Sequence, residues 1–100
     1  MFFTREDLDE LGEAVLGELK NTFKNNSYIT SLELASVYCE DTTTVIIQVI
    51  VNDMYLQCRS HVSLRTISKP SDLVEKYSYM IAAGFKEQIE KIIKKAELNG

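Results

Sequence analysis

The sequence contains few of the residues that mark a specialised class of protein. Its 100 residues include one proline, four glycines, two cysteines, one histidine and no tryptophan. Two cysteines are too few for a disulfide framework, and neither common glycine-rich phosphate-binding pattern occurs. The apolar runs are only a few residues long, whereas a membrane-spanning helix needs roughly 20. We therefore expect neither a disulfide scaffold nor a membrane span.

The composition that remains is that of an ordinary folded domain. Hydrophobic residues make up 45% of the chain and charged residues 26%, close to the average for globular proteins. The length predicts a single domain over residues 1–100. The first residues do not resemble a signal peptide, so we expect a cytoplasmic protein, or one in the host cytoplasm if the gene is viral. Cys39 and Cys58 are then expected to be reduced, buried thiols.

The charge is acidic overall but unevenly distributed. Fifteen acidic against eleven basic residues give a formal net charge of −4. Residues 1–27 hold six acids and three bases, whereas residues 69–100 hold five acids and six lysines. Binding to nucleic acid usually requires a basic surface, because contacts with phosphate supply much of the affinity. The charge balance therefore argues against that class of protein.

The first segment has the pattern of an amphipathic helix. Thr4 and Asp7 have the spacing of a capping box, and Asn25-Asn26-Ser27 contains turn-forming residues that end the helix. Gly12 lies on the apolar side, where it would allow close packing. The apolar residues recur at helical spacing: Leu8, Leu11, Val15, Leu19 and Phe23.

The middle of the chain predicts three strands. The first spans residues 28–39, with a bulge near Ala35 and Ser36 where the apolar alternation slips. The second spans residues 43–51 and is β-branched and apolar on both faces, which is typical of a central strand. Asn52-Asp53 then predicts a two-residue hairpin turn. The third strand begins at Met54 and pairs back along the second, and residues 62–67 either continue it or form a short separate strand.

A second helix follows and completes the predicted fold. Pro70 suits a first helical turn, and Asp72 with Glu75 offers a cap. Apolar residues then recur at helical spacing from Leu73 to Ala96. The order is helix, three antiparallel strands, helix. We therefore predict an α+β fold, a two-layer αβββα sandwich with both helices on one face of the sheet.

This order of elements is similar to that of three groups of proteins. Double-stranded-RNA-binding domains share it, but they enter the last helix with lysines, whereas this chain has Asp72-Leu73-Val74-Glu75 there. YbaB-type nucleoid-associated proteins resemble it in the hairpin and in residues 81–86, but Asn52-Asp53 lacks their glycine. Small acidic phage-encoded inhibitors share the layout and the negative charge. These are resemblances of element order, so no functional residue is carried over from any of them.

Catalytic and metal-binding patterns are absent from the sequence. His61 is the only histidine, and no pattern supplies a nucleophile and an orienting carboxylate beside it. Cys39, Cys58 and His61 lack the spacing of a zinc site and a fourth ligand. We therefore expect no catalytic residue, no cofactor, no metal and no small-molecule substrate.

The face of the sheet that the helices leave open is the first candidate interface. The predicted register places Ile46 and Ile50 on this face, with Tyr55 beside Ile50 and Arg59 beside Ile46. Exposed apolar patches commonly mark contacts with a partner or with a second copy. The alternative is that another segment of the chain covers these side chains.

The first helix supplies the second candidate. Four acids project from the side opposite its apolar residues: Glu6, Asp9, Glu10 and Glu13. They could bind a basic surface of a partner, and the alternative is that they form only the solvated side of an amphipathic helix.

Together these patterns predict a non-enzymatic protein–protein interaction module that self-associates. A phage or mobile-element inhibitor, or a minor assembly protein, would fit its size. One alternative is a nucleoid-type DNA-binding dimer that uses Arg59, Arg65 and the C-terminal lysines. The other is an enzyme whose catalytic carboxylates are dispersed along the chain.

Overall fold

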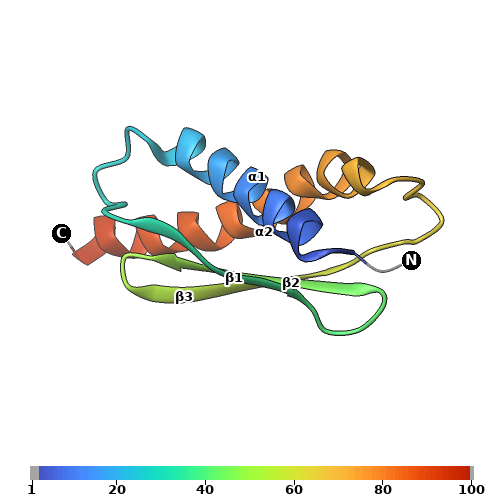
Figure 1. Cartoon of the computed structure of the whole chain (residues 1–100). Helices are drawn as coiled ribbons and strands as arrows, with labels where there is room; N and C mark the ends of the chain where they lie inside the picture. Colours follow the sequence, from blue (N-terminus) through green and yellow to red (C-terminus); the bar gives the residue numbers. More distant parts are fainter. Residues whose placement is uncertain (1–2, 100) are drawn as a thin grey trace.

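Five elements follow one another in the predicted order, helix, three strands, helix (Figure 1). The computed structural model describes residues 3–99. The strands form one antiparallel sheet in the order β1-β2-β3. The elements are α1 (Arg5–Phe23), β1 (Leu32–Cys39), β2 (Thr44–Val51), β3 (Met54–His61) and α2 (Pro70–Asn99). The α+β class and the αβββα order are therefore confirmed.

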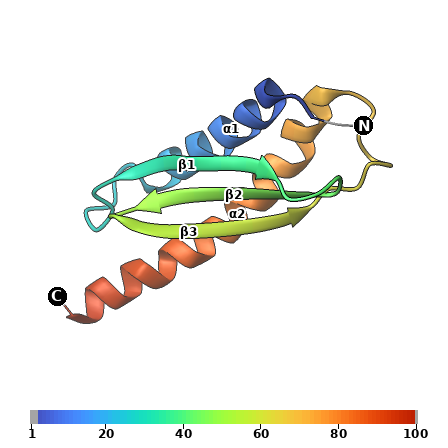
Figure 2. The same cartoon turned by 60° about the horizontal axis from the view of Figure 1, so that its bottom comes forward.

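Both helices cover the same face of the sheet, as predicted (Figures 1 and 2). The helix α1 lies over β1, α2 lies over β3, and the two helices pack against each other. The side chains of β2 that point toward the helices are at most 1% exposed: Val45, Ile47, Val49 and Val51. They meet fully buried residues of the two helices: Leu11, Val15 and Leu19 from α1, and Phe85 and Ile89 from α2. The core is therefore the space between the two layers.

The start of α1 has the predicted cap. The Asp7 amide donates to Thr4 Oγ1 at 3.1 Å, and the Thr4 amide donates to Asp7 Oδ2 at 2.9 Å. Each bond satisfies an amide that has no partner inside the helix.

The start of α2 differs from the prediction, because Asp72 does not cap the helix together with Glu75. Its carboxylate reaches back to the amides of Ser68 and Lys69, so it fills the role that Asp7 fills in α1.

The sheet has the predicted register. Asn52 and Asp53 form the turn with φ angles of 51° and 67°, and β2 and β3 pair without a break from Val51 opposite Met54 to Thr44 opposite His61. The register of β1 against β2 shifts between Leu34 and Ser36, which confirms the bulge. A bulge here lets Leu34 and Val37 both face the helices, although they are three residues apart.

Two ends of strands differ from the prediction. Residues 28–31 are not strand, because the Asn52 side chain takes up hydrogen-bonding groups that a strand would use. Residues 62–67 are not strand either. There the Ser63 amide donates to the Tyr77 hydroxyl at 2.8 Å, and Val62 and Ile67 are buried. This loop therefore packs against α2 and does not extend the sheet.

Two glycines lie where a helix comes closest to an edge strand. A Cβ atom on Gly12 would stand 2.9 Å from Leu34 Cδ2, and one on Gly84 would stand 3.2 Å from Cys58 Sγ. Both distances are shorter than an ordinary contact between non-bonded atoms. The prediction of close packing at Gly12 is therefore confirmed.

Among residues 3–99, neither helix is long and apolar enough to cross a membrane.

Candidate interaction surfaces

The acidic side of α1 is exposed. Glu6, Asp9, Glu10 and Glu13 all lie on the solvent side of the helix. Asp9 is engaged within the molecule, because Arg5 donates to its carboxylate from Nε at 3.0 Å and from Nη2 at 2.8 Å. The other three carboxylates have no cation within 4.0 Å among the described residues. The acidic face of α1, meaning Glu6, Glu10 and Glu13 from here on, therefore carries uncompensated charge.

The sheet face opposite the helices, called the outer face below, differs from the prediction at Ile46. Ile46 lies on this face but is only 2% exposed. Its cross-strand partners are Tyr38 and Arg59, whose long side chains stand within reach on either side of it. Arg59 is also held in place by an ion pair with Glu40. The prediction that Ile46 is an exposed apolar residue is therefore wrong, because residues of both edge strands enclose it.

A polar row separates the remaining apolar residues of the outer face. Ser36 Oγ donates to Gln48 Oε1 at 2.6 Å, and Gln48 Nε2 donates to Gln57 Oε1 at 3.1 Å. On one side of this row, Ile50 is half-buried and Tyr55 is 72% exposed. The outer face is therefore a polar surface with isolated aromatic side chains, and not a continuous apolar patch.

The basic residues of the DNA-binding alternative lie far apart. Arg59 is paired with Glu40 on the outer face. Arg65 lies in the loop between β3 and α2, at the end of the molecule opposite the C-terminal lysines (Figure 1). The molecule is 48 Å long, so these cations do not combine into one basic surface within a single copy of the chain.

The two cysteines differ from the prediction in one respect. Cys58 is half-buried beneath Gly84, but Cys39 is exposed near the end of an edge strand. Burial raises the pKa of Cys58. Burial also raises the pKa of Cys39, against the lowering effect of Arg5, and Asp41 adds to the rise. A raised pKa reduces the thiolate fraction at neutral pH, so neither thiol is activated as a nucleophile. No cluster of potential metal ligands occurs among residues 3–99.

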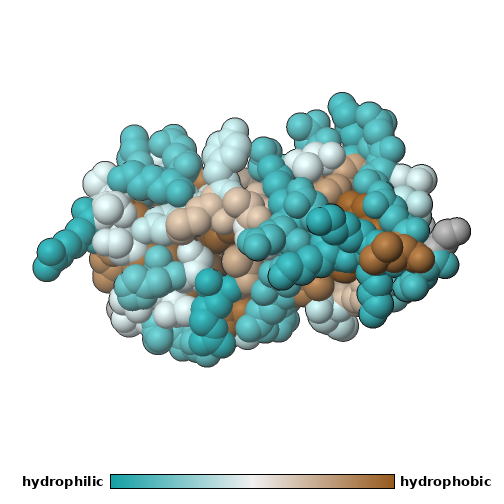
Figure 3. Space-filling model, turned by 180° about the vertical axis from the view of Figure 1, so that it is seen from behind, coloured by the Kyte–Doolittle hydropathy of each residue, from teal (hydrophilic) through white to brown (hydrophobic). Residues whose placement is uncertain are grey.

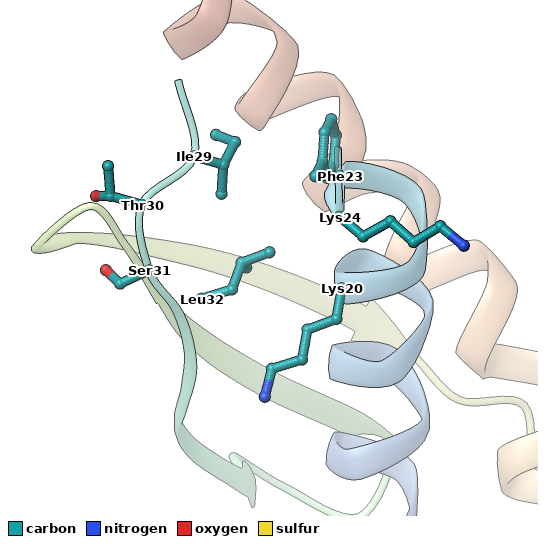
Figure 4. Close-up of a pocket in the computed structure, with 7 residues that line it drawn as sticks. All are labelled: Lys20, Phe23, Lys24, Ile29, Thr30, Ser31 and Leu32. Carbon is teal, nitrogen blue, oxygen red and sulfur yellow. The ribbon is translucent and has the colours of Figure 1, made fainter. Parts of the chain in front are cut away.

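One groove was not indicated by the sequence. It has a volume of about 300 Å³ and lies between the end of α1 and residues 29–32 (Figure 4). Phe23, Ile29 and Leu32 supply the apolar side chains of its floor. Lys20 runs along its open side toward β1, and Lys24 extends outward from the same helix. The spacing of the two lysines around Phe23 was visible in the sequence, but the position of residues 29–32 was not.

Asn52 explains how those residues are placed. Its Oδ1 atom accepts hydrogen bonds from the Thr30 amide at 2.7 Å, the Thr30 hydroxyl at 2.9 Å and the Ser31 amide at 3.2 Å. Its Nδ2 atom donates to the Tyr28 carbonyl at 2.7 Å. A residue of the β2–β3 turn thus holds the segment that precedes β1, and it does so across more than twenty residues of sequence.

A second lysine-flanked groove lies on the other side of the molecule. Met54, Ile92 and Ala96 line it together with Lys91, Lys95 and Asn99, and its volume is about 470 Å³. Seen from behind, hydrophilic side chains cover most of the surface, and apolar side chains show only in narrow areas between them (Figure 3). Neither groove contains a group of residues typical of catalysis.

No protein-family model, curated protein or solved structure matches this chain. Function therefore has to be inferred from the surfaces described above.

Proposed function

We propose that this protein is a non-enzymatic protein–protein interaction module whose acidic face on α1 contacts a basic surface of a partner protein. The observation that carries the proposal is that Glu6, Glu10 and Glu13 are exposed on one side of the helix, with no cation of residues 3–99 within 4.0 Å. An inhibitor or a minor assembly component acting in the cytoplasm of a cell or of an infected host would use such a surface.

The spacing of the three acids supports this proposal. The first and the last are seven positions apart, which is about 10 Å at a rise of 1.5 Å per residue. Like charges three or four residues apart repel each other and slightly destabilise a helix. A partner with lysine or arginine at matching positions would relieve that repulsion. Charges of this kind mainly raise the rate of association, and their effect decreases with salt.

The test compares two triple variants with the same change in net charge. A partner is first captured from the native host and then purified. The variant Glu6→Gln, Glu10→Gln, Glu13→Gln should weaken its binding about tenfold, since exposed pairs contribute about 0.5 kcal/mol each. The control is Glu87→Gln, Glu90→Gln, Glu97→Gln, which changes three exposed acids of α2. Equal weakening in both variants, or none in the first, would contradict the proposal.

Self-association through the outer face is a second candidate. The observation in its favour is that this face exposes two aromatic rings, Tyr38 at 39% and Tyr55 at 72%, with Ile50 half-buried beside the second. Sedimentation over a wide concentration series should show a dimer, and Tyr55→Ser should weaken it. Tyr79→Ser is the matched control, because Tyr79 is 69% exposed on α2. A monomer at every concentration would exclude this candidate.

A further inference from the structure

The groove between Lys20 and residues 29–32 opens along an edge of the sheet. β1 is an outer strand, paired only with β2. The Asn52 amide donates to the Ser31 carbonyl, so Leu32 and Val51 form a non-hydrogen-bonded pair of the antiparallel ladder. The N–H and C=O groups of Leu32 therefore point away from β2, toward the open edge. Because this pattern alternates along a strand, the same groups of Leu34 also face the edge.

This open part of the edge is short and has a definite end. Further along the edge, the Val37 carbonyl already has a hydrogen-bond partner, because Nη2 of Arg5 on α1 donates to it at 2.6 Å. The bulge between Leu34 and Ser36 interrupts the ladder before that point. At the other end, Asn52 holds Thr30 and Ser31 by their amides. The backbone from residue 30 to residue 34 is thus fixed in place before any partner arrives, which lowers the entropic cost of binding.

The side chains beside this edge select the kind of partner. A strand added next to β1 would point alternate side chains toward the helix layer. There they would meet the apolar floor of Phe23, Ile29 and Leu32, and the ammonium group of Lys20. Neither Lys20 nor Lys24 has a carboxylate within 4.0 Å among residues 3–99. An apolar residue followed two positions later by an acid would therefore match both features.

We propose that the edge of β1 at Leu32 and Leu34, together with the groove beside Lys20 and Lys24, binds an extended acidic segment of a partner protein as a fourth strand. This surface is separate from the acidic face of α1, because Lys20 lies in the last turn of that helix and Lys24 is its C-cap, whereas the acids lie in its first half. Main-chain hydrogen bonds would supply affinity, and the groove and lysines would supply specificity.

The experiment uses the full chain labelled with ¹⁵N and synthetic peptides of about six residues, a usual strand length. In one peptide set, glutamate and valine alternate at the positions that face the helix layer. In a second set, lysine replaces glutamate. In a third set, the backbone amides that would pair with β1 are N-methylated. Amide chemical shifts of Leu32 and Leu34 report binding. We expect the acidic set to shift these amides, and the lysine and N-methylated sets to leave them unchanged.

Two charge-matched variants complete the test. Lys20→Gln with Lys24→Gln should weaken binding of the acidic peptides by about tenfold or more, as expected for the loss of two charge-assisted contacts. Lys91→Gln with Lys95→Gln removes two lysines from the other groove and should leave binding unchanged. The proposal is overturned if no acidic peptide shifts the two amides, if the N-methylated peptides bind equally well, or if the two variants lose the same affinity.

Discussion

At the scale of single residues, Asp72 joins the loop after the sheet to the start of α2. Its Oδ2 atom accepts hydrogen bonds from the Ser68 hydroxyl at 2.7 Å, the Ser68 amide at 3.0 Å and the Lys69 amide at 3.3 Å. The Ser68 hydroxyl, followed by the Ser68 and Lys69 amides and the charge of Lys76, lowers the pKa of Asp72, while burial opposes this effect. The ionised carboxylate is therefore the form that the fold prefers.

This preference predicts a pH dependence of stability. Because the pKa of Asp72 is lower in the folded state, its contribution is complete above the unfolded value of about 3.9 and is lost as pH falls through the folded pKa. We expect Asp72→Asn to be less stable than the natural sequence at neutral pH, with a difference that shrinks below about pH 4. Urea unfolding followed by circular dichroism between neutral pH and about pH 2 measures this difference.

Two features make that measurement specific to Asp72. Hydrogen bonds from Thr43 and Thr44 also lower the pKa of Asp41, so the natural protein loses stability in acid for more than one reason. Subtracting the variant from the natural protein removes this shared contribution. Glu75→Gln, which neutralises a nearby exposed acid of the same helix, is the control for the loss of one negative charge. A constant difference for Asp72→Asn would contradict the assignment.

At the scale of elements, Asn52 connects the β2–β3 turn to the segment that leads into β1. Replacing it with glycine keeps the positive φ angle of the turn but removes four hydrogen bonds to residues 28–31. We expect Asn52→Gly to lower the free energy of unfolding by about 1–3 kcal/mol, and the amides of Thr30 and Ser31 to exchange their hydrogens faster. Urea unfolding and hydrogen exchange measure the two effects.

Asp53→Gly is the control for this prediction. It changes the other turn residue with a positive φ angle, and the Asp53 side chain makes no hydrogen bond among the described residues. Little change in stability is expected there. If the two variants are equally stable, the Asn52 side chain contributes only through the turn itself.

The parts of the fold that are predictable from sequence depend on neighbours in the chain. The Thr4–Asp7 cap and the Asn52-Asp53 turn follow from the chemistry of a few adjacent residues. Ile46 was misread because its exposure depends on side chains of two other strands. The groove was missed for the same reason, since residues 28–31 are placed by Asn52 and not by their own propensity. Long-range contacts of this kind leave no periodic signal in the sequence.

At the scale of the whole molecule, both edges of the sheet are partly closed by the helices. Arg5 of α1 occupies the Val37 carbonyl on β1, and Gln88 Nε2 of α2 donates to the Gln57 carbonyl on β3 at 3.2 Å. Unpaired edge groups promote association between sheets of different molecules. We expect Gln88→Ala to increase concentration-dependent association, as measured by sedimentation velocity. Glu87→Ala, at an exposed neighbouring position, should not, and equal behaviour of the two variants would contradict this function of Gln88.

The position of α2 at the end of the fold has a consequence for synthesis of the chain. All three strands have been made once His61 is added, and each pairs with its neighbour in sequence, so the sheet can form early. At that stage the side chains of β2 that face the helices have no contact with Phe85 and Ile89. These two residues belong to α2, which is 30 residues long. Until that helix has left the ribosome, the side chains of β2 lack the cover that α2 provides in the folded protein. The growing chain is therefore most vulnerable to aggregation between the synthesis of β3 and that of α2.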